Sequence, residues 1–187
     1  MSAQEQLNAA LEKNAIIPVM TVNSEAHALE LGGKLVAEGY TVLEITLRTD
    51  SALDGIRVIK EAWPDLIVGA GTILSKGDAD NALAVGSDFL VTPATSPRLA
   101  EALLDMPVPV IPGISTATEA QTLYDMGYKQ LKFFPVESCG GAKMLKSLSS
   151  PLPHLMFMPS GGIKKETADD YLSLPNVFAI GGSWMTK

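Results

Sequence analysis

The chain has 187 residues, of which 19% are charged and 47% hydrophobic, and this balance suits one globular domain over residues 1–187 with a core of its own. A net charge of −7 argues against non-specific binding to nucleic acid, and no apolar run has the length of a membrane span or the form of a signal peptide. The single cysteine, Cys139, excludes an internal disulfide, so we expect a cytoplasmic protein with neither nucleic acid nor membrane among its partners.

In chain order, an amphipathic helical stretch over residues 2–14 is followed by alternating apolar runs and stretches of helical spacing. Helical spacing is clearest over residues 24–40, 96–106, 116–128 and 164–174, several of which begin with serine or threonine as N-cap. Eight short apolar runs are predicted to be strands, at residues 15–22, 41–48, 66–73, 89–95, 108–115, 130–137, 155–162 and 177–184.

Apolar strands separated by helices predict a parallel sheet covered on both faces. Eight such units predict an α/β fold of the (β/α)8 TIM-barrel type with an additional N-terminal helix. A doubly wound open sheet is the alternative, but it concentrates its chemistry at one switch point. Here nearly every predicted strand ends in a small or polar residue, which favours the barrel.

Two features fit this pattern less well. Gly32 and Gly33 fall in the middle of a predicted helix, where each costs about 1 kcal/mol relative to alanine, so we expect a close helix contact there. The sequence also ends directly after the eighth strand, so the eighth outer helix is missing from the predicted barrel. We expect the N-terminal helix, a neighbouring subunit or a further segment to cover the apolar flank.

The second predicted strand, TVLEITLR, carries an acid and a base on one face. Side chains alternate along a strand, which places Glu44, Thr46 and Arg48 on one side and Leu43 and Ile45 on the other. The aliphatic side suits the outer helices, so we expect the polar side to face the barrel interior near its C-terminal mouth. A structural ion pair is the alternative interpretation.

The sixth predicted strand, QLKFFPVE, places a lysine inside an apolar run. The same alternation puts Lys132, Phe134 and Val136 on one face, so Lys132 is expected to project into the same interior as Glu44. Two interpretations stay open. Either Glu44 holds the lysine charge for stability, or apolar neighbours such as Phe133 and Phe134 keep the amine uncharged often enough for it to act as a nucleophile.

The last two predicted strands end in PSGGI and IGGSW. Glycine lets backbone N–H groups approach an oxyanion, and many barrels bind phosphate in the loops after strands seven and eight. Two glycine pairs, each beside a serine (Ser160 and Ser183), therefore predict a phosphate site, although ordinary tight turns are the alternative. Thr72, after the third strand, adds a hydroxyl at the same rim or caps the next helix.

Metal ligands are sparse in the sequence. The two histidines, His27 and His154, fall in a helix and before the seventh strand, away from the predicted mouth, so no cluster with zinc-like spacing is expected. Cys139 has no histidine positioned beside it and is expected to fill space rather than act as a nucleophile.

Seven segments, LEITLRT, GAGTIL, VTPATSP, IPGISTATE, LKFFPVE, PSGGI and IGGSWM, together resemble the 2-keto-3-deoxy-6-phosphogluconate (KDPG) and 4-hydroxy-2-oxoglutarate (KHG) aldolases, in order and over essentially the whole chain. The resemblance implies a (β/α)8 class I aldolase, usually a homotrimer, that needs no metal or cofactor. It implies cleavage of a phosphorylated keto-sugar acid to pyruvate and glyceraldehyde 3-phosphate, and of KHG to pyruvate and glyoxylate. Members of the family continue into a last helix, which this sequence lacks.

The resemblance also implies roles for individual residues. Lys132 would form the Schiff base and Glu44 would transfer protons. Pyruvate and phosphate would be bound by a set of substrate-binding residues: Arg48, Thr72, Pro93, Phe134, Ser160, Gly161, Gly162, Gly182 and Ser183. Two alternatives are a non-catalytic barrel that binds phosphosugars, with Lys132 and Glu44 merely paired, and an oxaloacetate decarboxylase that uses the same imine. A metal-dependent epimerase is a weaker alternative.

Overall fold

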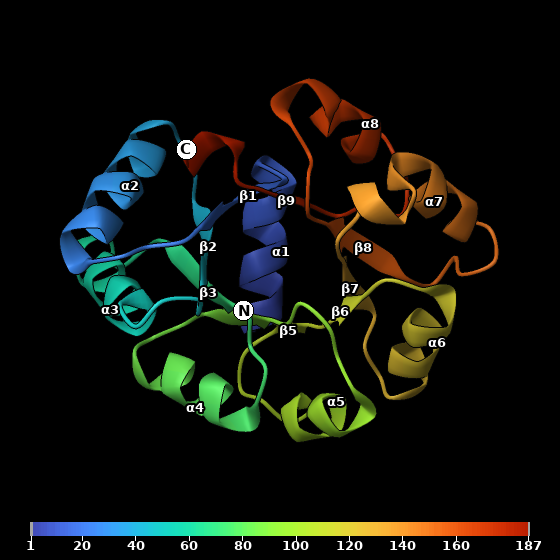
Figure 1. Ribbon diagram of the computed structural model, residues 1–187, viewed down its shortest axis with the longest axis horizontal. Coiled ribbons are helices and arrows are strands. Elements are labelled where there is room, and N and C mark those ends of the chain that lie inside the picture. The colour runs from blue at the N-terminus through green and yellow to red at the C-terminus, as the bar shows by residue number, and fades with distance from the viewer. Residues whose placement is uncertain (1, 187) are drawn as a thin grey trace.

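A computed structural model describes residues 2–186, with helices arranged around a set of central strands (Figure 1). The helices are α1 (Ala3–Lys13), α2 (Glu25–Ala37), α3 (Ala52–Ala62), α4 (Lys76–Ala84), α5 (Pro97–Leu103), α6 (Ala117–Asp125), α7 (Gly141–Leu148) and α8 (Ala168–Leu172). Three short 3-10 helices are η1 (Glu137–Cys139), η2 (Lys165–Thr167) and η3 (Trp184–Thr186). None of the helices in this part of the chain has both the length and the apolar character needed to cross a membrane.

The strands form two parallel sheets. They are β1 (Ile16–Met20), β2 (Val42–Thr46), β3 (Ile67–Gly71), β4 (Phe89–Val91), β5 (Val110–Ile111), β6 (Gly113–Ile114), β7 (Gln130–Phe133), β8 (Met156–Pro159) and β9 (Ile180–Gly182). Their orders are β5-β4-β3-β2-β1-β9 and β6-β7-β8. The parallel α/β arrangement predicted from the sequence is confirmed.

One predicted strand is divided in the structure. Residues 108–115 were expected to form a single strand, but β5 and β6 are separate segments on either side of Pro112. Proline has no N–H to donate to a ladder, so the strand breaks at this residue. The Pro112 carbonyl still accepts a hydrogen bond from the Lys132 N–H at 2.9 Å, which connects the break to β7.

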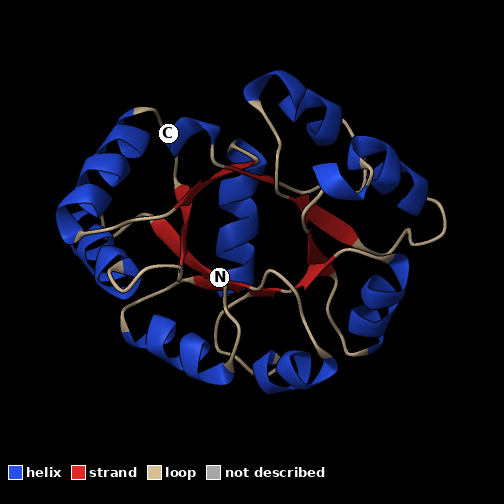
Figure 2. Ribbon diagram, viewed as in Figure 1, coloured by secondary structure: helices blue, strands red, loops and turns tan. Residues whose placement is uncertain are grey.

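The strands follow one another around a common interior, with α2 to α8 outside and α1 lying across the interior (Figure 2). Between the two sheets, β8 approaches β9 through parallel bridges from Ser160 to Gly181 and from Phe157 to Val177. On the other side, β5 leads directly into β6 through Pro112. The carboxyl ends of all these strands therefore open toward one end of the molecule.

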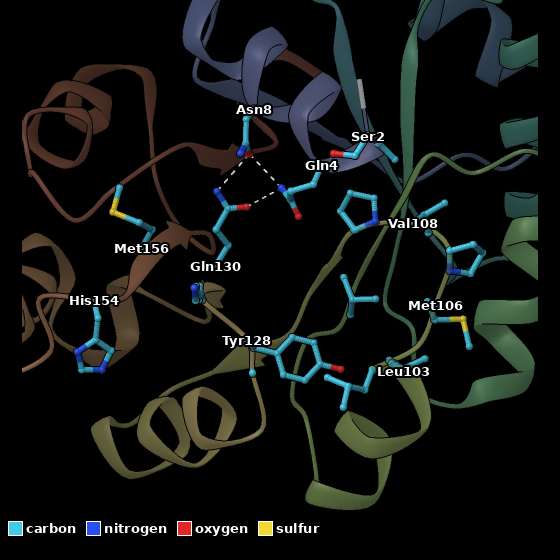
Figure 3. A pocket seen from close by; sticks show the side chains of 17 residues that line it. Ser2, Gln4, Asn8, Leu103, Met106, Val108, Tyr128, Gln130, His154 and Met156 are labelled. Carbon is cyan, nitrogen blue, oxygen red and sulfur yellow. Dashed lines mark hydrogen bonds between the residues drawn. The ribbon is translucent and has the colours of Figure 1, made fainter.

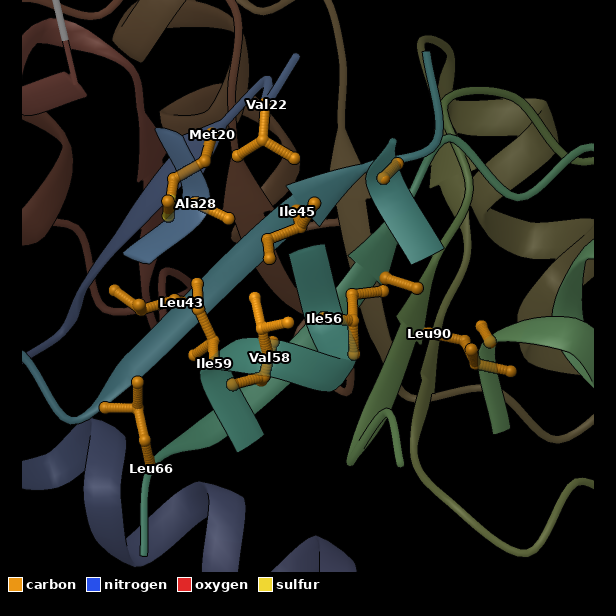
Figure 4. Packing of buried hydrophobic residues seen from close by; sticks show 14 of the residues in the cluster. Met20, Val22, Ala28, Leu43, Ile45, Ile56, Val58, Ile59, Leu66 and Leu90 are labelled. Atoms are coloured by element: carbon orange, nitrogen blue, oxygen red, sulfur yellow. The ribbon is translucent and has the colours of Figure 1, made fainter. Parts of the chain in front are cut away.

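Alternation along β2 separates an outer and an inner face, as predicted. Leu43 and Ile45 are fully buried and pack outward against residues of α2 and α3 in one hydrophobic cluster (Figure 4). Val42 belongs to a different cluster, inside the ring of strands. Glu44 and Thr46 are also buried, at 0% and 1% exposure, so the polar face of β2 is the inner one.

The glycine pair in α2 lies at a close contact with α3. A Cβ atom on Gly32 would lie 3.1 Å from Ile59 Cδ1 and 3.1 Å from Trp63 Cζ3. A Cβ atom on Gly33 would be in ordinary contact with the Trp63 ring. The predicted close helix contact is confirmed, and the loss of helix propensity at these positions allows α2 and α3 to approach.

The N-terminal helix α1 covers the end of the interior where the strands begin. Its Leu7 and Leu11 are buried against Ile17, Val42 and Phe89, near the beginnings of β1, β2 and β4. The Ser2 side chain caps α1, since its hydroxyl accepts a hydrogen bond from the Glu5 N–H. The suggestion that α1 covers the flank after the last strand is therefore wrong, because the apolar face of α1 packs against the beginnings of the strands.

The flank beside β9 is partly covered by the residues that follow it. Trp184 and Met185 in η3 pack against the hydrophobic cluster beneath α2. The Lys34 ammonium, on α2, donates a hydrogen bond to the Met185 carbonyl at 3.4 Å. These contacts connect the end of the described chain to the first outer helix.

We predict that Leu11→Ala lowers the free energy of unfolding by about 2 to 5 kcal/mol, because it leaves a cavity between α1 and the strands. Leu29→Ala, on the outer side of α2 with 38% exposure, is the matched control and should change it by less than about 0.5 kcal/mol. Urea unfolding of both variants measures the difference. Equal stabilities would contradict the role assigned to α1.

Candidate active site

The interior contains a buried lysine and a buried carboxylate in direct contact. Lys132 Nζ lies 3.2 Å from Glu44 Oε1, and the two side chains are only 7% and 0% exposed. Lys132 comes from β7 and Glu44 from β2, which belong to different sheets, so the pair spans the interior. Because isolated buried charges are very costly, each group depends on the other.

Only one oxygen of Glu44 is used in this pair. Glu44 Oε2 is buried and has no hydrogen-bond partner within the described residues. A buried carboxylate oxygen normally accepts at least one hydrogen bond, and one without a partner calls for an explanation such as a catalytic role. The arrangement therefore leaves a strong acceptor beside the lysine amine and available to a bound molecule.

A glycine in the neighbouring strand makes room for the Glu44 carboxylate. A Cβ atom on Gly71, the last residue of β3, would lie 2.1 Å from Glu44 Oε1. Two residues earlier, a Cβ atom on Gly69 would overlap the Phe89 ring, so these two inward positions of β3 require glycine. Gly71 was not predicted as a site residue, although it directly precedes the predicted Thr72 in the segment GAGTIL.

The aromatic surroundings of Lys132 differ from those expected. The Phe134 ring lies near the amine, with 5.5 Å between its centroid and Lys132 Nζ. Phe133 faces outward and contacts Phe157 edge to face, and Val136 belongs to the same outer cluster. The expectation that Phe133 surrounds the amine, and that Val136 shares its face, is wrong. Alternation itself places Phe133 opposite Lys132, and because the strand ends at Phe133 the alternation does not extend to Val136.

Arg48 and Thr72 lie together at the mouth, beyond Glu44. Arg48 Nε donates a hydrogen bond to Thr72 Oγ1 at 3.4 Å, and the arginine is exposed. Thr72 has a φ of +61°, a left-handed conformation that is uncommon outside glycine and is often found at functional sites. The Arg48 guanidinium provides a local positive charge at this rim of a protein whose net charge is −7.

Pro93 reaches the site through a close approach of β4 and β6. Gly113 pairs with Lys132 in the ladder, and a Cβ atom on Gly113 would lie 2.6 Å from the Pro93 carbonyl oxygen. The buried Thr92 hydroxyl accepts a hydrogen bond from the Gly113 N–H at 2.8 Å. Thr92 and Gly113 thus place Pro93 beside the lysine strand.

The first glycine pair forms a turn next to Phe134. Gly161 and Gly162 have φ values of +99° and +90°, in the region that favours glycine. A Cβ atom on Gly161 would lie 3.0 Å from Phe134 Cδ2. Within residues 2–186, the Gly162 N–H donates no hydrogen bond to another protein group, whereas the Gly161 N–H lies at the parallel bridge between Ser160 and Gly181. A free N–H at such a turn suits an anion.

The second glycine pair, Gly181 and Gly182, is explained by close packing. A Cβ atom on Gly181 would lie 3.0 Å from Ser160 Oγ, so the buried serine uses the space that glycine leaves. A Cβ atom on Gly182 would overlap the Trp184 ring. Ser183 follows β9 and is exposed. Packing accounts for these glycines, whereas the turn at Gly161 and Gly162 requires positive φ.

A cavity of about 780 Å³ lies elsewhere, at the ends where β5, β7 and β8 begin (Figure 3). Gln4, Asn8 and Gln130 are linked there by mutual side-chain hydrogen bonds between α1 and β7. None of the predicted site residues lines this cavity. In the described part of the chain, no group of three or more His, Cys, Asp or Glu residues is arranged to hold a metal ion.

Comparisons with known proteins agree on one family. Residues 7–187 match the family described as "Aldolase: KDPG and KHG aldolase". The 2-dehydro-3-deoxy-phosphogluconate aldolase of Pseudomonas aeruginosa is 42% identical over 170 residues, which are 91% of this chain and 77% of that protein. The KHG/KDPG aldolase of Escherichia coli K12 is 41% identical over 175 residues, covering 94% of this chain and 82% of that one.

Solved structures give the same result. A crystal structure of the KDPG aldolase of Legionella pneumophila, with pyruvate captured at low pH as a covalent carbinolamine, has a TM-score of 0.90 at 37% identity. The match covers 95% of this chain and 86% of that one. The KDPG aldolase of Zymomonas mobilis ZM4, solved with 3-phosphoglycerate, also has a TM-score of 0.90, at 35% identity, with coverage of 95% and 85%.

We predict strong coupling between Lys132 and Glu44 in a double-mutant cycle. Lys132→Met alone should lower the free energy of unfolding at pH 7 by about 3 to 5 kcal/mol, because it leaves a buried carboxylate without its cation. The double variant Lys132→Met/Glu44→Gln should be more stable than Lys132→Met, since no unpaired charge remains. Urea unfolding measures the cycle, and additive effects would contradict a mutually dependent pair.

Proposed function

The chain belongs to the KDPG and KHG aldolase family, and from this premise we propose that it cleaves KDPG to pyruvate and glyceraldehyde 3-phosphate through a Schiff base on Lys132. We also propose KHG, which yields pyruvate and glyoxylate, as a second substrate. The family assignment makes the protein an aldolase, a carbon–carbon lyase. The observation that carries the proposed chemistry is the buried Lys132–Glu44 pair with its unpartnered Oε2.

Imine formation needs an uncharged amine, and the pair offers a route to it. Glu44 Oε1 lies within hydrogen-bond distance of Lys132 Nζ and can take its proton. In a poorly hydrated interior, an uncharged amine beside a protonated carboxylic acid costs less free energy to bury than separated charges would. The amine then attacks the C2 ketone of the substrate, and one proton of the amine passes to the C2 oxygen, directly or through water. The protonated Glu44 supplies the second proton, so the C2 oxygen leaves as water and the nitrogen keeps one proton as an iminium.

Cleavage follows from the iminium cation. Glu44 takes the proton of the C4 hydroxyl, directly or through water, and the C3–C4 bond breaks as the C4–O bond becomes a carbonyl. The electron pair of the broken bond passes to the iminium and gives an enamine. Glu44 then returns the proton to C3, and hydrolysis of the iminium releases pyruvate. The unpartnered Oε2 supports this role, because it can accept a proton while Oε1 faces the lysine.

The substrate's two anionic ends are assigned to opposite rims of the mouth. We propose that Arg48 and Thr72 hold the pyruvyl carboxylate, which is supported by the 3.4 Å contact between them. For the phosphate we propose the N–H groups of Gly161 and Gly162, with Ser183 beside them. Ser160 and Gly182 lie next to this phosphate site, while Pro93 and Phe134 would line the reacting part of the substrate.

We further propose that the two sheets are parts of one (β/α)8 barrel. The bridge from Ser160 to Gly181 and the direct passage from β5 to β6 through Pro112 support this interpretation. In such a barrel the active site lies at the carboxyl ends of the strands, where the proposed substrate-binding residues are found. The homotrimer implied by the family resemblance stays a prediction.

Two alternatives have distinct consequences. A non-catalytic barrel that binds phosphosugars would keep Lys132 and Glu44 as a permanent ion pair and would never bond covalently to pyruvate. An oxaloacetate decarboxylase would form the same imine but gain nothing from a phosphate group. The glycine turn, with its unused Gly162 N–H, favours a phosphorylated substrate over the second alternative.

We predict that borohydride added with pyruvate produces a stable adduct on Lys132, seen as a mass increase of the intact chain and located by peptide mapping. Lys132→Met should give no adduct. Lys60→Met is the matched control, since Lys60 is also partly buried and pairs with Asp88 at 2.8 Å, and it should still react. A wild-type chain that stays unmodified would refute covalent catalysis.

We predict that Glu44→Gln still forms the imine with pyruvate, more slowly because Lys132 loses the carboxylate that takes its proton, and lowers kcat for KDPG cleavage by about 10² to 10⁴-fold, because the amide cannot accept the C4 hydroxyl proton. Asp88→Asn, which removes a carboxylate from a different lysine pair, should retain wild-type kcat. Steady-state kinetics with enzymatic detection of pyruvate measures both. Unchanged turnover of Glu44→Gln would remove Glu44 from the mechanism.

A further inference from the structure

A carboxylate lies directly beside the turn proposed to bind phosphate. A Cβ atom on Gly162 would be 2.8 Å from Glu137 Cγ, so the Glu137 side chain packs against this glycine. The Glu137 N–H also donates a hydrogen bond to the Gly161 carbonyl at 3.2 Å. A negative charge free to turn toward a bound phosphate would oppose binding. Phosphate binding at this turn therefore requires an interaction that holds the Glu137 carboxylate away from the phosphate.

Tyr171 provides a partner for this carboxylate. Tyr171 lies on α8, is 2% exposed, and its hydroxyl donates a hydrogen bond to Glu137 Oε1. Burial, and then the hydrogen bond to Glu137, raise the pKa of the Tyr171 phenol well above its ordinary value, so it remains a donor throughout the physiological range. The tyrosine is fixed inside a hydrophobic cluster and cannot follow the carboxylate toward solvent.

The start of α7 borders the Tyr171–Glu137 pair, in which Glu137 itself is exposed. Gly141 has a φ of +63°, and a Cβ atom there would lie 3.3 Å from the Tyr171 hydroxyl and 3.8 Å from Glu137 Oε2. The carboxylate is thus directed toward α7 and α8. Its aliphatic carbons face Gly162.

We propose that Tyr171 is a positioning residue for phosphate recognition, because it holds the Glu137 charge away from the phosphate at Gly161 and Gly162. The inference rests on the proposed function, since phosphate binding at this turn is itself a proposal. Tyr171 would touch neither substrate nor Lys132. Its effect should therefore appear in the preference for phosphorylated over unphosphorylated substrate.

The test compares kcat/KM for KDPG, which carries a phosphate, with kcat/KM for KHG, which does not. Tyr171→Phe releases the carboxylate and should lower kcat/KM for KDPG by about tenfold, with less than about a twofold change for KHG. Pyruvate trapping on Lys132 should be unchanged. Tyr128→Phe is the matched control, because Tyr128 is also buried and its hydroxyl donates to the Ala100 carbonyl at 2.7 Å, away from the turn.

A charge effect can be separated from a packing effect by rescue. Adding Glu137→Gln to Tyr171→Phe removes the released charge and should restore the KDPG to KHG ratio to within about twofold of wild type. If Tyr171→Phe fails to fold, Glu137→Asp serves instead, since its shorter side chain keeps the charge but cannot reach Tyr171. It should lower the ratio as Tyr171→Phe does.

An equal loss for both substrates, an unchanged ratio, or a ratio that Glu137→Gln does not restore would overturn the inference. Failure of the proposed function would look different, because the wild-type protein itself would cleave neither substrate and trap no pyruvate.

Discussion

The candidate active site depends on one contact, the 3.2 Å approach of Lys132 Nζ to Glu44 Oε1 inside the ring of strands. Neither charge could remain buried alone, and the apolar residues below the pair, against which α1 packs, offer no other partner. The pair is nevertheless incomplete, because Glu44 Oε2 has no hydrogen bond within the described residues. A pair that served stability alone would be expected to satisfy both oxygens.

The strands around this pair are adapted to it. Gly71 leaves the space for the Glu44 carboxylate, and Gly113 allows Pro93 to approach the lysine strand. Both glycines have ordinary φ values, so close packing explains them. Gly161 differs, because its left-handed conformation shapes a turn in which the next residue, Gly162, has an unused N–H group. Glycine thus serves two physical purposes at this site, one steric and one conformational.

Much of this arrangement could be predicted from the sequence, because alternation along β2 and β7 separates an apolar outer face from a polar inner one. Alternation also places Phe133 on the outer face, so the expectation that Phe133 surrounds the amine went against the pattern, whereas Val136 lies beyond the end of the strand, where alternation no longer applies. Gly71 was missed because its role depends on β2 and β3 being neighbours, a tertiary relation that its local sequence does not encode. The position of α1 below the strands likewise depends on long-range packing.

The most direct test of the account is a crystal structure of the protein soaked in pyruvate. The account predicts a covalent bond from Lys132 Nζ to C2 of pyruvate, with the Glu44 carboxylate no longer paired to a free ammonium. Pyruvate bound without a bond to the amine, with Lys132 and Glu44 still in their ion pair, would contradict it.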